Sequence, residues 1–504
     1  MIATRSSTVD DVVRRSALRH PGRTALLFQD RTWTYRELDD AVTRAAGVLL
    51  DLGLAQGDRV AAYGKNSDAY LLGFLGCARA GLIHVPINYN LAGDELSYLV
   101  DQSGSRAALT DPALAGKFDE IEHSLETVLV LRDGDGSLLD QSRTGPLPTV
   151  DVTVADTDLV QLLYTSGTTA RPKGAMMTHR AFVHEYVSVI LSEDFSSDDV
   201  ALHAMPLYHS AGMHAFLLPY LAIGAVNHLM EAPDVPEILR RVEADSISSL
   251  FLAPTVWVPL SNHADLATRD LSSLHKAYYG ASIMPQPVLQ RLQKRLPDLG
   301  FYNCFGQSEI GPLATVLGPD EHADRPESCG RAVLFVELRV VDGDGNDVPP
   351  GELGEVVYRS PQLCEGYWDK PEETAEAFYG GWFHSGDLVR ADADGFITVV
   401  DRIKDVINTG GVLVASREVE DALYDHPAVA EAAVISTPDE RWIEAITAFV
   451  VVKDEVTAEA LIAHVRGKLA GFKVPKRVLF VDELPRNASG KLLKRVLRDG
   501  LAES

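Results

Sequence analysis

Strand and helix patterns alternate along the first 150 residues, and this alternation constrains the fold more strongly than any other feature of the chain. Apolar runs predict strands at 59–63, 83–87 and 106–110, and helical patterns lie between them at 67–80, which begins with Ser67 as its N-cap, and 94–100. Strands separated by helical patterns of about 10–15 residues are typical of βαβ units. The sequence therefore predicts an α/β fold for this part of the chain.

The last hundred residues have shorter elements and denser charge than the rest of the chain. Their patterns predict helices at 417–424 and 459–470 and strands at 432–436, 445–452 and 477–481. These elements make a compact α+β unit of roughly 100 residues, which is enough for a small domain. The charged run 401–405 interrupts the apolar pattern just before them. We therefore expect two domains, at 1–402 and 403–504.

Composition and charge argue against several classes of protein. Of the 504 residues, 46% are hydrophobic and 23% are charged, as in ordinary globular proteins, which argues against a disordered, collagen-like or coiled-coil chain. Acidic residues number 72 against 46 basic ones, and the resulting net charge of −26 repels nucleic acid and anionic lipid at long range. We expect no nucleic-acid partner.

Targeting signals are absent from the segments where they usually occur. The first ten residues lack the apolar core of a secretory signal, and the most apolar stretch, 215–226, is about half the roughly 20 residues that a bilayer span needs. Four cysteines without a CxxC pair do not make a disulfide framework, and a reducing compartment is the ordinary setting for such thiols. We expect a cytoplasmic protein without stable membrane insertion.

The most informative segment is a loop rich in hydroxyls and glycines that follows a strand pattern at 159–163. It reads Tyr164-Thr-Ser-Gly-Thr-Thr-Ala-Arg-Pro-Lys-Gly174. Backbone amides, hydroxyls and a cation together can wrap a polyphosphate. The order is not that of a Walker loop, because Lys173 precedes the final glycine and no glycine stands directly before it. By composition alone, a polar surface loop would be the ordinary interpretation.

This loop resembles the phosphate-loop signature of the adenylate-forming superfamily, which includes acyl- and aryl-CoA synthetases, peptide-synthetase adenylation domains and firefly luciferases. Further segments resemble other signatures of the superfamily in the family's order, and together they run from residue 164 to residue 491. The resemblance covers almost the whole chain. It implies a large N-terminal domain of βα layers, with sheets sandwiched between helices, and a small mobile α+β C-terminal domain.

The resemblance also implies where ATP and Mg²⁺ bind. The loop would hold the phosphates, and Glu309 together with Thr165 would hold Mg²⁺, for which carboxylate and phosphate oxygens are typical ligands. Asp387 would accept hydrogen bonds from the ribose hydroxyls. The expected ATP-binding residues are Thr165, Ser166, Gly167, Thr168, Thr169, Lys173, Gly280, Ala281, Asn303, Phe305, Gly306, Ser308, Asp387 and Arg402.

The acyl pocket is expected beside Pro206-Leu-Tyr-His-Ser-Ala-Gly212, which resembles the segment that places a histidine or an aromatic residue at the pocket mouth. The expected lining is mostly small or apolar and carries no fixed charge, which favours a hydrophobic monocarboxylic acid larger than acetate. Fatty, aryl and alicyclic acids are all open at this point. The expected lining residues are His209, Met213, Phe251, Ala253, Val256, Gly280, Ala281 and Cys304.

The C-terminal segments resemble those that serve two successive half-reactions. Lys491, in Pro485-Arg-Asn-Ala-Ser-Gly-Lys491, would bridge the carboxylate and the α-phosphate during adenylation. Rotation of the small domain about Lys404 would then bring Gly410 and Gly411 toward the active site for the coenzyme A thiol. The expected catalytic residues are Lys491, Glu309, His209 and Thr165.

Two segments depart from the family pattern. Ala170 stands where the family usually has glycine, and at a position of positive φ alanine would cost about 1 kcal/mol or more. The lysine and the hydroxyls of the loop remain. After Gly411, the usual Glu-Asn-Ile-Tyr-Pro run is replaced by the largely apolar run 412–416, so polar groups near the coenzyme A arm are lost.

The activity implied by the resemblance is the ATP-dependent conversion of a carboxylic acid into acyl-AMP and then into acyl-CoA, with ATP, Mg²⁺ and coenzyme A. An amino acid is disfavoured as the substrate, because 208–212 contains no acid to pair with an ammonium group. A free-standing acyl-AMP ligase that loads a carrier protein is the alternative, although 338–388 lacks the insertion typical of fatty acyl-AMP ligases.

Other classes fit the sequence less well. A non-enzymatic binding module would not need Lys173, Glu309 and Lys491 together. The chain contains neither a GxSxG nucleophile elbow nor an HExxH zinc helix. The acidic stretch 342–347 faintly resembles a calcium loop but lacks the full ligand spacing, so we expect a hairpin turn there.

Overall fold

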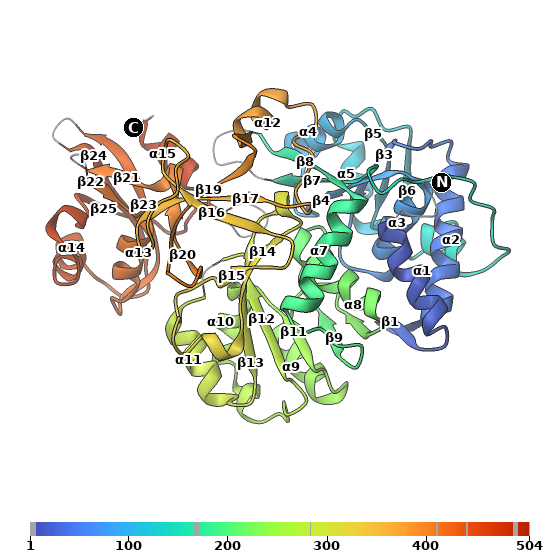
Figure 1. Ribbon diagram of the computed structural model, residues 1–504, viewed down its shortest axis with the longest axis horizontal. Coiled ribbons are helices and arrows are strands. Elements are labelled where there is room, and N and C mark those ends of the chain that lie inside the picture. Colours follow the sequence, from blue (N-terminus) through green and yellow to red (C-terminus); the bar gives the residue numbers. More distant parts are fainter. Residues whose placement is uncertain are drawn as a thin grey trace. The chain divides into compact units, whose positions relative to one another are not determined.

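The computed structural model describes residues 7–165, 171–282, 284–409, 412–439, 442–486 and 492–502 (Figure 1). The chain divides into two compact units. The first contains the described residues up to 165, 172–337 and 359–383, and the second contains Arg171, 338–358 and the chain from 384 onward. The boundary expected between residues 402 and 403 falls inside the second unit. The role of Lys404, next to this boundary, as a pivot stays a prediction.

A nine-stranded sheet forms the larger layer of the first unit. Its strands are β1 (Thr24–Phe28), β2 (Arg31–Thr34), β9 (Val200–His203), β10 (Val226–Leu229), β11 (Ser249–Phe251), β12 (Lys276–Gly280), β13 (Gly300–Gly306), β14 (Leu313–Leu317) and β15 (Arg331–Ala332). They lie in the order β15-β14-β13-β12-β11-β9-β10-β1-β2. The strands from β13 to β1 are parallel, and antiparallel strands flank them at both edges. The register places Tyr278 between Phe251 and Tyr302.

A six-stranded sheet forms the second layer. Its strands are β3 (Arg59–Tyr63), β4 (Ile83–Ile87), β5 (Ser105–Thr110), β6 (Thr127–Val130), β7 (Leu159–Thr165) and β8 (Lys173–Thr178), in the order β6-β5-β3-β4-β7-β8. All are parallel except β8, which returns antiparallel to β7. The predicted strands 59–63, 83–87 and 106–110 are confirmed. The β7–β8 pair brackets the segment that resembles the phosphate loop.

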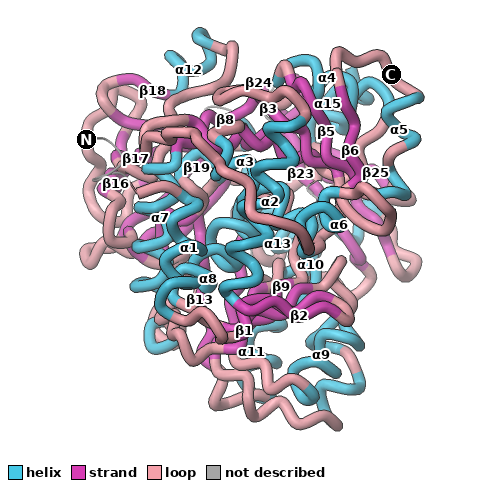
Figure 2. Tube along the Cα trace, turned by 90° about the vertical axis from the view of Figure 1, so that its right-hand side faces the viewer, coloured by secondary structure: helices cyan, strands magenta, loops and turns pink. Residues whose placement is uncertain are grey.

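The helices of the first unit occupy the faces of these sheets. They are α1 (Val9–Arg19), α2 (Tyr35–Asp51), α3 (Asp68–Ala80), α4 (Gly93–Ser103), α5 (Gly116–Asp119), α6 (Leu138–Arg143), α7 (His179–Ser192), α8 (Leu218–Ile223), α9 (Val235–Ala244), α10 (Pro254–Asn262), α11 (Gln286–Arg295) and α12 (Pro371–Ala377). The predicted cap is confirmed, because the Ser67 hydroxyl accepts a hydrogen bond from the Tyr70 amide at the start of α3. Figure 2 shows α1, α2, α3 and α8 beside one another, in agreement with the packing of α2 on α3 and of α1 on α8.

Buried apolar side chains define the layers. One core cluster joins α1, α2, α3, α7 and α8 to residues of both sheets, such as Leu26 of β1 and Val60 of β3. A second packs α9, α10 and α11 against the other face of the nine-stranded sheet, with Trp257 fully buried. A third packs α4 against the other face of the six-stranded sheet, around Tyr63. The expected arrangement of sheets between helices is therefore confirmed.

The second unit contains two further sheets and three α-helices among its described residues. One sheet has β16 (Glu337–Val341), β17 (Leu353–Arg359), β19 (Trp382–Ala391), β18 (Phe378–Tyr379) and β20 (Ile397–Arg402), of which β18 and the ends of three others belong to the first unit. The other has β22 (Val412–Val414), β21 (Ile407–Thr409), β24 (Ile443–Val452), β23 (Val429–Asp439) and β25 (Arg477–Phe480). The helices are α13 (Ser416–Tyr424), α14 (Ala458–Arg466) and α15 (Lys494–Ala502).

One expected helix is shorter than the pattern predicted. The helix expected at 459–470 ends at Arg466, with Gly467 as its C-cap. Glycine is a poor helix former, and the chain turns there while Leu469 still packs on the core of the unit. The periodicity of the apolar residues therefore continued past the end of the helix. The hairpin turn expected at 342–347 is confirmed: the Asp342 carboxylate accepts hydrogen bonds from the amides of Asp344 and Asn346.

In the described part of the chain, no helix combines the length and the apolar character that a bilayer span requires.

Candidate active site

Glu309 is the buried carboxylate around which the first unit gathers its predicted site residues. It lies in a short 3₁₀ turn, Ser308–Ile310, directly after β13, and its side chain is 7% exposed. Its Oε1 accepts hydrogen bonds from the Thr165 hydroxyl at 3.1 Å and from the Tyr367 hydroxyl at 3.0 Å. Two hydroxyl donors on one oxygen fix the orientation of the carboxylate. The structure thus brings Thr165 and Glu309, the two expected Mg²⁺ ligands, into direct contact.

This donor set suits Mg²⁺ chemically. A carboxylate and a hydroxyl are hard oxygen donors, and Mg²⁺ usually takes only one or two protein ligands and completes its shell with phosphate oxygens and water. No cluster of three or more His, Cys, Asp or Glu side chains suited to a metal occurs in the described ranges. The hydroxyl and the carboxylate therefore fit a Mg²⁺ ion that takes phosphate oxygens as further ligands.

Lys173 stands at the end of the same site. It opens β8 and pairs with Thr165 across the β7–β8 ladder. Its ammonium lies 4.6 Å from the centre of the Tyr367 ring, a cation–π distance. One tyrosine thus supports both a predicted cation and a predicted metal-binding carboxylate. Ser166, Gly167, Thr168 and Thr169, which were expected to bind phosphate, lie outside the described residues.

Two glycines, at the ends of β12 and β13, leave no room for a side chain. A Cβ added to Gly280 would lie 2.2 Å from the Cys304 carbonyl oxygen, and one added to Gly306 would lie 2.1 Å from the Pro312 carbonyl oxygen. Ala281 follows Gly280 with φ of +64°, a conformation that costs a residue with a Cβ about 1 kcal/mol or more. Backbone strain of this kind clusters at functional sites, which fits the adenine-binding role predicted for this turn.

We expect Gly280→Ala to lower the free energy of unfolding by about 1–3 kcal/mol, because the new methyl group must displace the neighbouring strand. Chemical denaturation of the purified variant measures this. Gly116→Ala is the matched control, since nothing lies within 4 Å of the added Cβ there. Equal stability of the two variants would contradict the close approach of β12 and β13.

Three more predicted nucleotide residues lie on β13 and the turn after it. The Asn303 amide donates a hydrogen bond to the Ser328 carbonyl at 2.9 Å. The Ser308 hydroxyl lies 3.0 Å from the Ser210 hydroxyl, and Phe305 is half-buried. Their contacts with a nucleotide stay predictions.

The predicted acyl-pocket residues lie on several elements of the first unit. Phe251 of β11, Gly280 of β12 and Cys304 of β13 lie on three consecutive strands of the nine-stranded sheet, and Gly280 pairs with Cys304. Met213 is completely buried in the main core cluster, so part of its role is structural. Val256, on α10, is half-buried. Their membership of one pocket stays a prediction.

His209 has an unusual electrostatic setting. Its side chain is exposed, yet the surrounding protein desolvates the ring and lowers the pKa of His209 to about 4. At neutral pH the ring is therefore uncharged, and it adds no cation to the site.

The predicted ribose residues belong to the second unit. Asp387 of β19 pairs with Arg402 of β20 in the strand register, and the Arg402 Nε lies 2.7 Å from the Asp387 Oδ1. The turn before Asp387 is held by Glu355, whose carboxylate contacts the His384 ring at 2.8 Å and accepts from the Gly386 amide at 2.8 Å. Asp387 and Arg402 thus form an ion pair in the structure. Their contacts with ribose stay predictions.

The predicted pivot lies just after this pair. Lys404 is in a short 3₁₀ turn, Ile403–Asp405. Arg498 of α15 forms an ion pair with Asp405 at 2.6 Å and donates to the Lys404 carbonyl at 3.4 Å. The helix that follows the predicted lysine loop is therefore tied to the predicted pivot. Gly410, Gly411 and Lys491 lie outside the described residues.

Two residues that the sequence did not indicate take part in the site of the first unit. Tyr367 contacts Glu309 and Lys173, and Ser210 contacts Ser308. Ser210 lies in the segment that resembles the pocket mouth, so its position was within the predicted region. Tyr367 follows a glycine in Glu365-Gly-Tyr-Trp368, and nothing in this local pattern points to a carboxylate 58 positions earlier.

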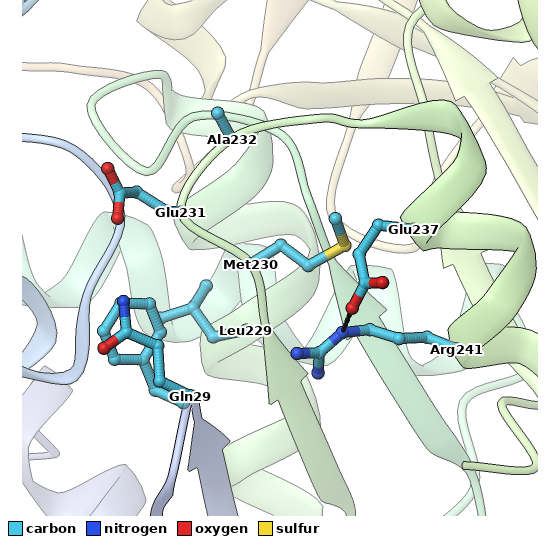
Figure 3. Close-up of a pocket in the computed structure, with 8 residues that line it drawn as sticks. Gln29, Leu229, Met230, Glu231, Ala232, Glu237 and Arg241 are labelled. Atoms are coloured by element: carbon cyan, nitrogen blue, oxygen red, sulfur yellow. Dashed lines mark hydrogen bonds and ion pairs between the residues drawn. The ribbon is translucent and has the colours of Figure 1, made fainter. Parts of the chain in front are cut away.

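A separate recess of about 280 Å³ lies beside the ends of β1 and β10 (Figure 3). Its charged residues are already paired: Glu237 with Arg241 at 2.8 Å, and Glu231 with Lys65 at 3.1 Å. None of the predicted site residues lines it. Its lining residues are Phe28, Gln29, Leu229, Met230, Glu231, Ala232, Glu237 and Arg241.

Comparisons with known proteins match almost the whole chain. The family described as AMP-binding enzyme matches residues 13–368, and the AMP-binding enzyme C-terminal domain matches residues 418–491. A feruloyl-CoA synthase from Amycolatopsis sp is 38% identical over 96% of this chain and 97% of its own length. The fatty acid–[acyl-carrier-protein] ligase ScoC from Streptomyces coeruleorubidus is 34% identical over 96% of this chain and 94% of its own.

A solved structure agrees with the fold along the same length. The o-succinylbenzoate CoA synthetase MenE from Bacillus subtilis, in complex with an acyl-adenylate intermediate, has a TM-score of 0.89 at 28% identity and covers 97% of this chain and 98% of its own. The same synthetase in complex with ATP and a magnesium ion has a TM-score of 0.87 at 27% identity, over 96% and 98%.

Proposed function

This chain belongs to the AMP-binding enzyme family, and on that premise we propose that it is an acid–thiol ligase that activates a hydrophobic carboxylic acid with ATP and transfers the acyl group to coenzyme A. The observation that carries the proposal is one cluster at the end of β7, in which Glu309 contacts Thr165 and Tyr367 and Lys173 lies over the Tyr367 ring. A carboxylate with a hydroxyl and a cation is the set of groups that an ATP-dependent activation requires.

The first step joins two anions. A carboxylate oxygen attacks the α-phosphorus of ATP, the bond to the pyrophosphate oxygen breaks, and acyl-AMP and pyrophosphate form. Mg²⁺ bound with the phosphates supplies charge neutralisation. Lys173 and the hydroxyls of its loop bind the phosphates. Lys491 supplies a cation between the carboxylate and the α-phosphate, where negative charge accumulates. Glu309 and Thr165 orient the metal-bearing end of the nucleotide.

The second step forms the thioester. The sulfur of coenzyme A, as thiolate, attacks the acyl carbonyl carbon, and the bond to the AMP phosphate oxygen breaks with AMP as leaving group. The uncharged His209 would face the acid at the pocket mouth. Asp387 and Arg402 would hold the ribose, and rotation about Lys404 would replace Lys491 by Gly410 and Gly411 between the steps. The proposal also includes the division of the chain into two domains, 1–402 and 403–504. It further includes a cytoplasmic location for the protein.

The experiment is to incubate the protein with MgATP, coenzyme A and a panel of acids from acetate through long-chain fatty acids, benzoates, cinnamates and cyclic acids. Mass spectrometry measures AMP, pyrophosphate and thioester. AMP and acyl-CoA appearing together support the ligase. Accumulated acyl-adenylate without thioester would contradict coenzyme A as the acceptor and leave a carrier protein, as in the similar ScoC, in its place. No pyrophosphate with any acid would contradict acid activation.

A further inference from the structure

Gln362 is a fully buried amide beside the turn that carries Glu309, and the proposed reaction gives it no role. It lies in the segment that leads from β17 to α12, and its side chain is completely enclosed. The side-chain nitrogen donates to the Glu185 carboxylate, to the Ile310 carbonyl at 3.3 Å and to the Leu313 carbonyl at 3.1 Å. One side chain thus holds two carbonyls of the same turn.

Two residues of α7 complete this network. Glu185 and Ser188 are one helical turn apart, and both are fully buried. The Oε1 of Glu185 accepts a hydrogen bond from the Leu313 amide at 2.9 Å, and the Ser188 hydroxyl donates to the side-chain oxygen of Gln362 at 2.6 Å. Both polar atoms of the Gln362 side chain and both oxygens of Glu185 therefore have a partner. A buried network that is fully satisfied specifies one arrangement of the backbone it contacts.

The segment of Gln362 reaches Glu309 by two further contacts. The Cys364 amide donates to the Glu309 carbonyl at 2.8 Å, and the Tyr367 hydroxyl donates to the Glu309 carboxylate at 3.0 Å. One residue further on, the backbone amide donates at 2.8 Å to the Gly174 carbonyl in β8. This segment therefore joins the turn of the predicted metal-binding carboxylate to the strand that begins with the predicted phosphate-binding lysine.

We propose that Gln362 and Glu185 are positioning residues, which hold the turn that carries Glu309 so that its carboxylate faces the Mg²⁺ ion bound with ATP. This inference rests on the proposed function and deepens it. Both residues act through the backbone after Glu309, at Ile310 and Leu313. Mg²⁺ demands near-ideal octahedral geometry, so a small displacement of a ligand weakens its binding. An apolar side chain of the same size would fill the space and leave the turn free to shift.

The test measures how much Mg²⁺ contributes to nucleotide binding. Calorimetry gives the affinity for ATP with Mg²⁺ and with EDTA, and the first divided by the second is the Mg²⁺ ratio. Gln362→Met keeps the length of the side chain and removes its hydrogen bonds. It should lower the Mg²⁺ ratio about fivefold, the scale of one lost hydrogen bond. Ser188→Ala removes only the bond that orients the amide and should lower the ratio about twofold.

Asn227→Leu is the matched control, because Asn227 is likewise a fully buried amide that donates to two backbone carbonyls, those of Ala25 at 3.0 Å and Ala225 at 3.1 Å. It lies on β10, which three strands separate from β13 in the sheet. Both variants should lower the melting temperature, and only Gln362→Met should lower the Mg²⁺ ratio. An unchanged ratio in folded Gln362→Met, or an equal loss in both variants, would overturn the inference. If Gln362→Met does not fold, an unchanged ratio in Ser188→Ala overturns it.

A double-mutant cycle tests whether Gln362 acts through Glu309. Two residues that affect metal binding independently have additive effects, and residues that act through one another do not. In the Glu309→Gln background, Gln362→Met should leave the Mg²⁺ ratio at the value of Glu309→Gln alone. A further loss of about fivefold in that background would contradict positioning through Glu309.

The binding experiment contains no acid substrate, so its outcome is separate from that of the proposed function. A lower Mg²⁺ ratio in Gln362→Met, together with no pyrophosphate release for any acid, would contradict acid activation and support the role of Gln362. Pyrophosphate release by the wild type, together with an unchanged ratio in Gln362→Met, would support acid activation and contradict the role of Gln362.

Discussion

Replacing Lys491 by alanine is expected to slow acyl-adenylate formation by about 10²–10³-fold, while thioester formation from a supplied acyl-adenylate stays near the wild-type rate. The reason is the charge that each step develops. Adenylation brings a carboxylate against a phosphate and needs a cation between them. The attack of a thiolate on an activated carbonyl develops charge elsewhere, and under the proposed rotation Lys491 is absent from the site in that step.

Separate assays of the two half-reactions measure this difference. Pyrophosphate release reports adenylation, and conversion of synthetic acyl-adenylate with coenzyme A reports thioester formation. Lys453→Ala is the control, since it removes an exposed lysine of the same unit. An equal loss in both half-reactions would refute the assignment of Lys491 to adenylation and of the segment at Gly410 and Gly411 to thioester formation.

The elements of the fold were predictable where short-range patterns decide them. The strand at 59–63 and the helix that begins after Ser67 have the predicted bounds, because apolar periodicity and an N-cap hydroxyl act within a few residues. The helix expected at 459–470 ended four residues early. Leu469 keeps the apolar period although the helix has ended, since a turn delivers its side chain to the same core. Periodicity indicates burial, and burial does not require the helix to continue.

The candidate site was predictable as a set of segments and only partly as a set of contacts. The order of the segments placed Thr165 and Glu309 in one site, and the structure brings their side chains to 3.1 Å. Tyr367 was missed, because its partner Glu309 is 58 positions away in the sequence. The topology of the sheets creates these contacts, and no local spacing encodes them.

Glu309→Gln is expected to lower kcat/KM for MgATP by at least about 100-fold, which corresponds to about 2.7 kcal/mol of transition-state stabilisation. The amide keeps the size of the side chain and loses the negative charge that would hold Mg²⁺. The Mg²⁺ concentration for half-maximal rate should rise in parallel. Tyr367→Phe should have a smaller effect, of a few fold, because Thr165 still donates to the carboxylate.

A titration of initial rate against Mg²⁺ at fixed ATP measures both quantities, with pyrophosphate release as the readout. Glu365→Gln is the matched control, since this glutamate is exposed and lies two positions before Tyr367. It should leave the Mg²⁺ dependence unchanged. If Glu309→Gln lowers the rate but the Mg²⁺ dependence does not move, the carboxylate acts by holding Thr165 and Tyr367 in place, and the metal-binding role is wrong. A joint shift in rate and Mg²⁺ dependence, graded from Glu309→Gln to Tyr367→Phe, is the result that a metal-orienting carboxylate requires.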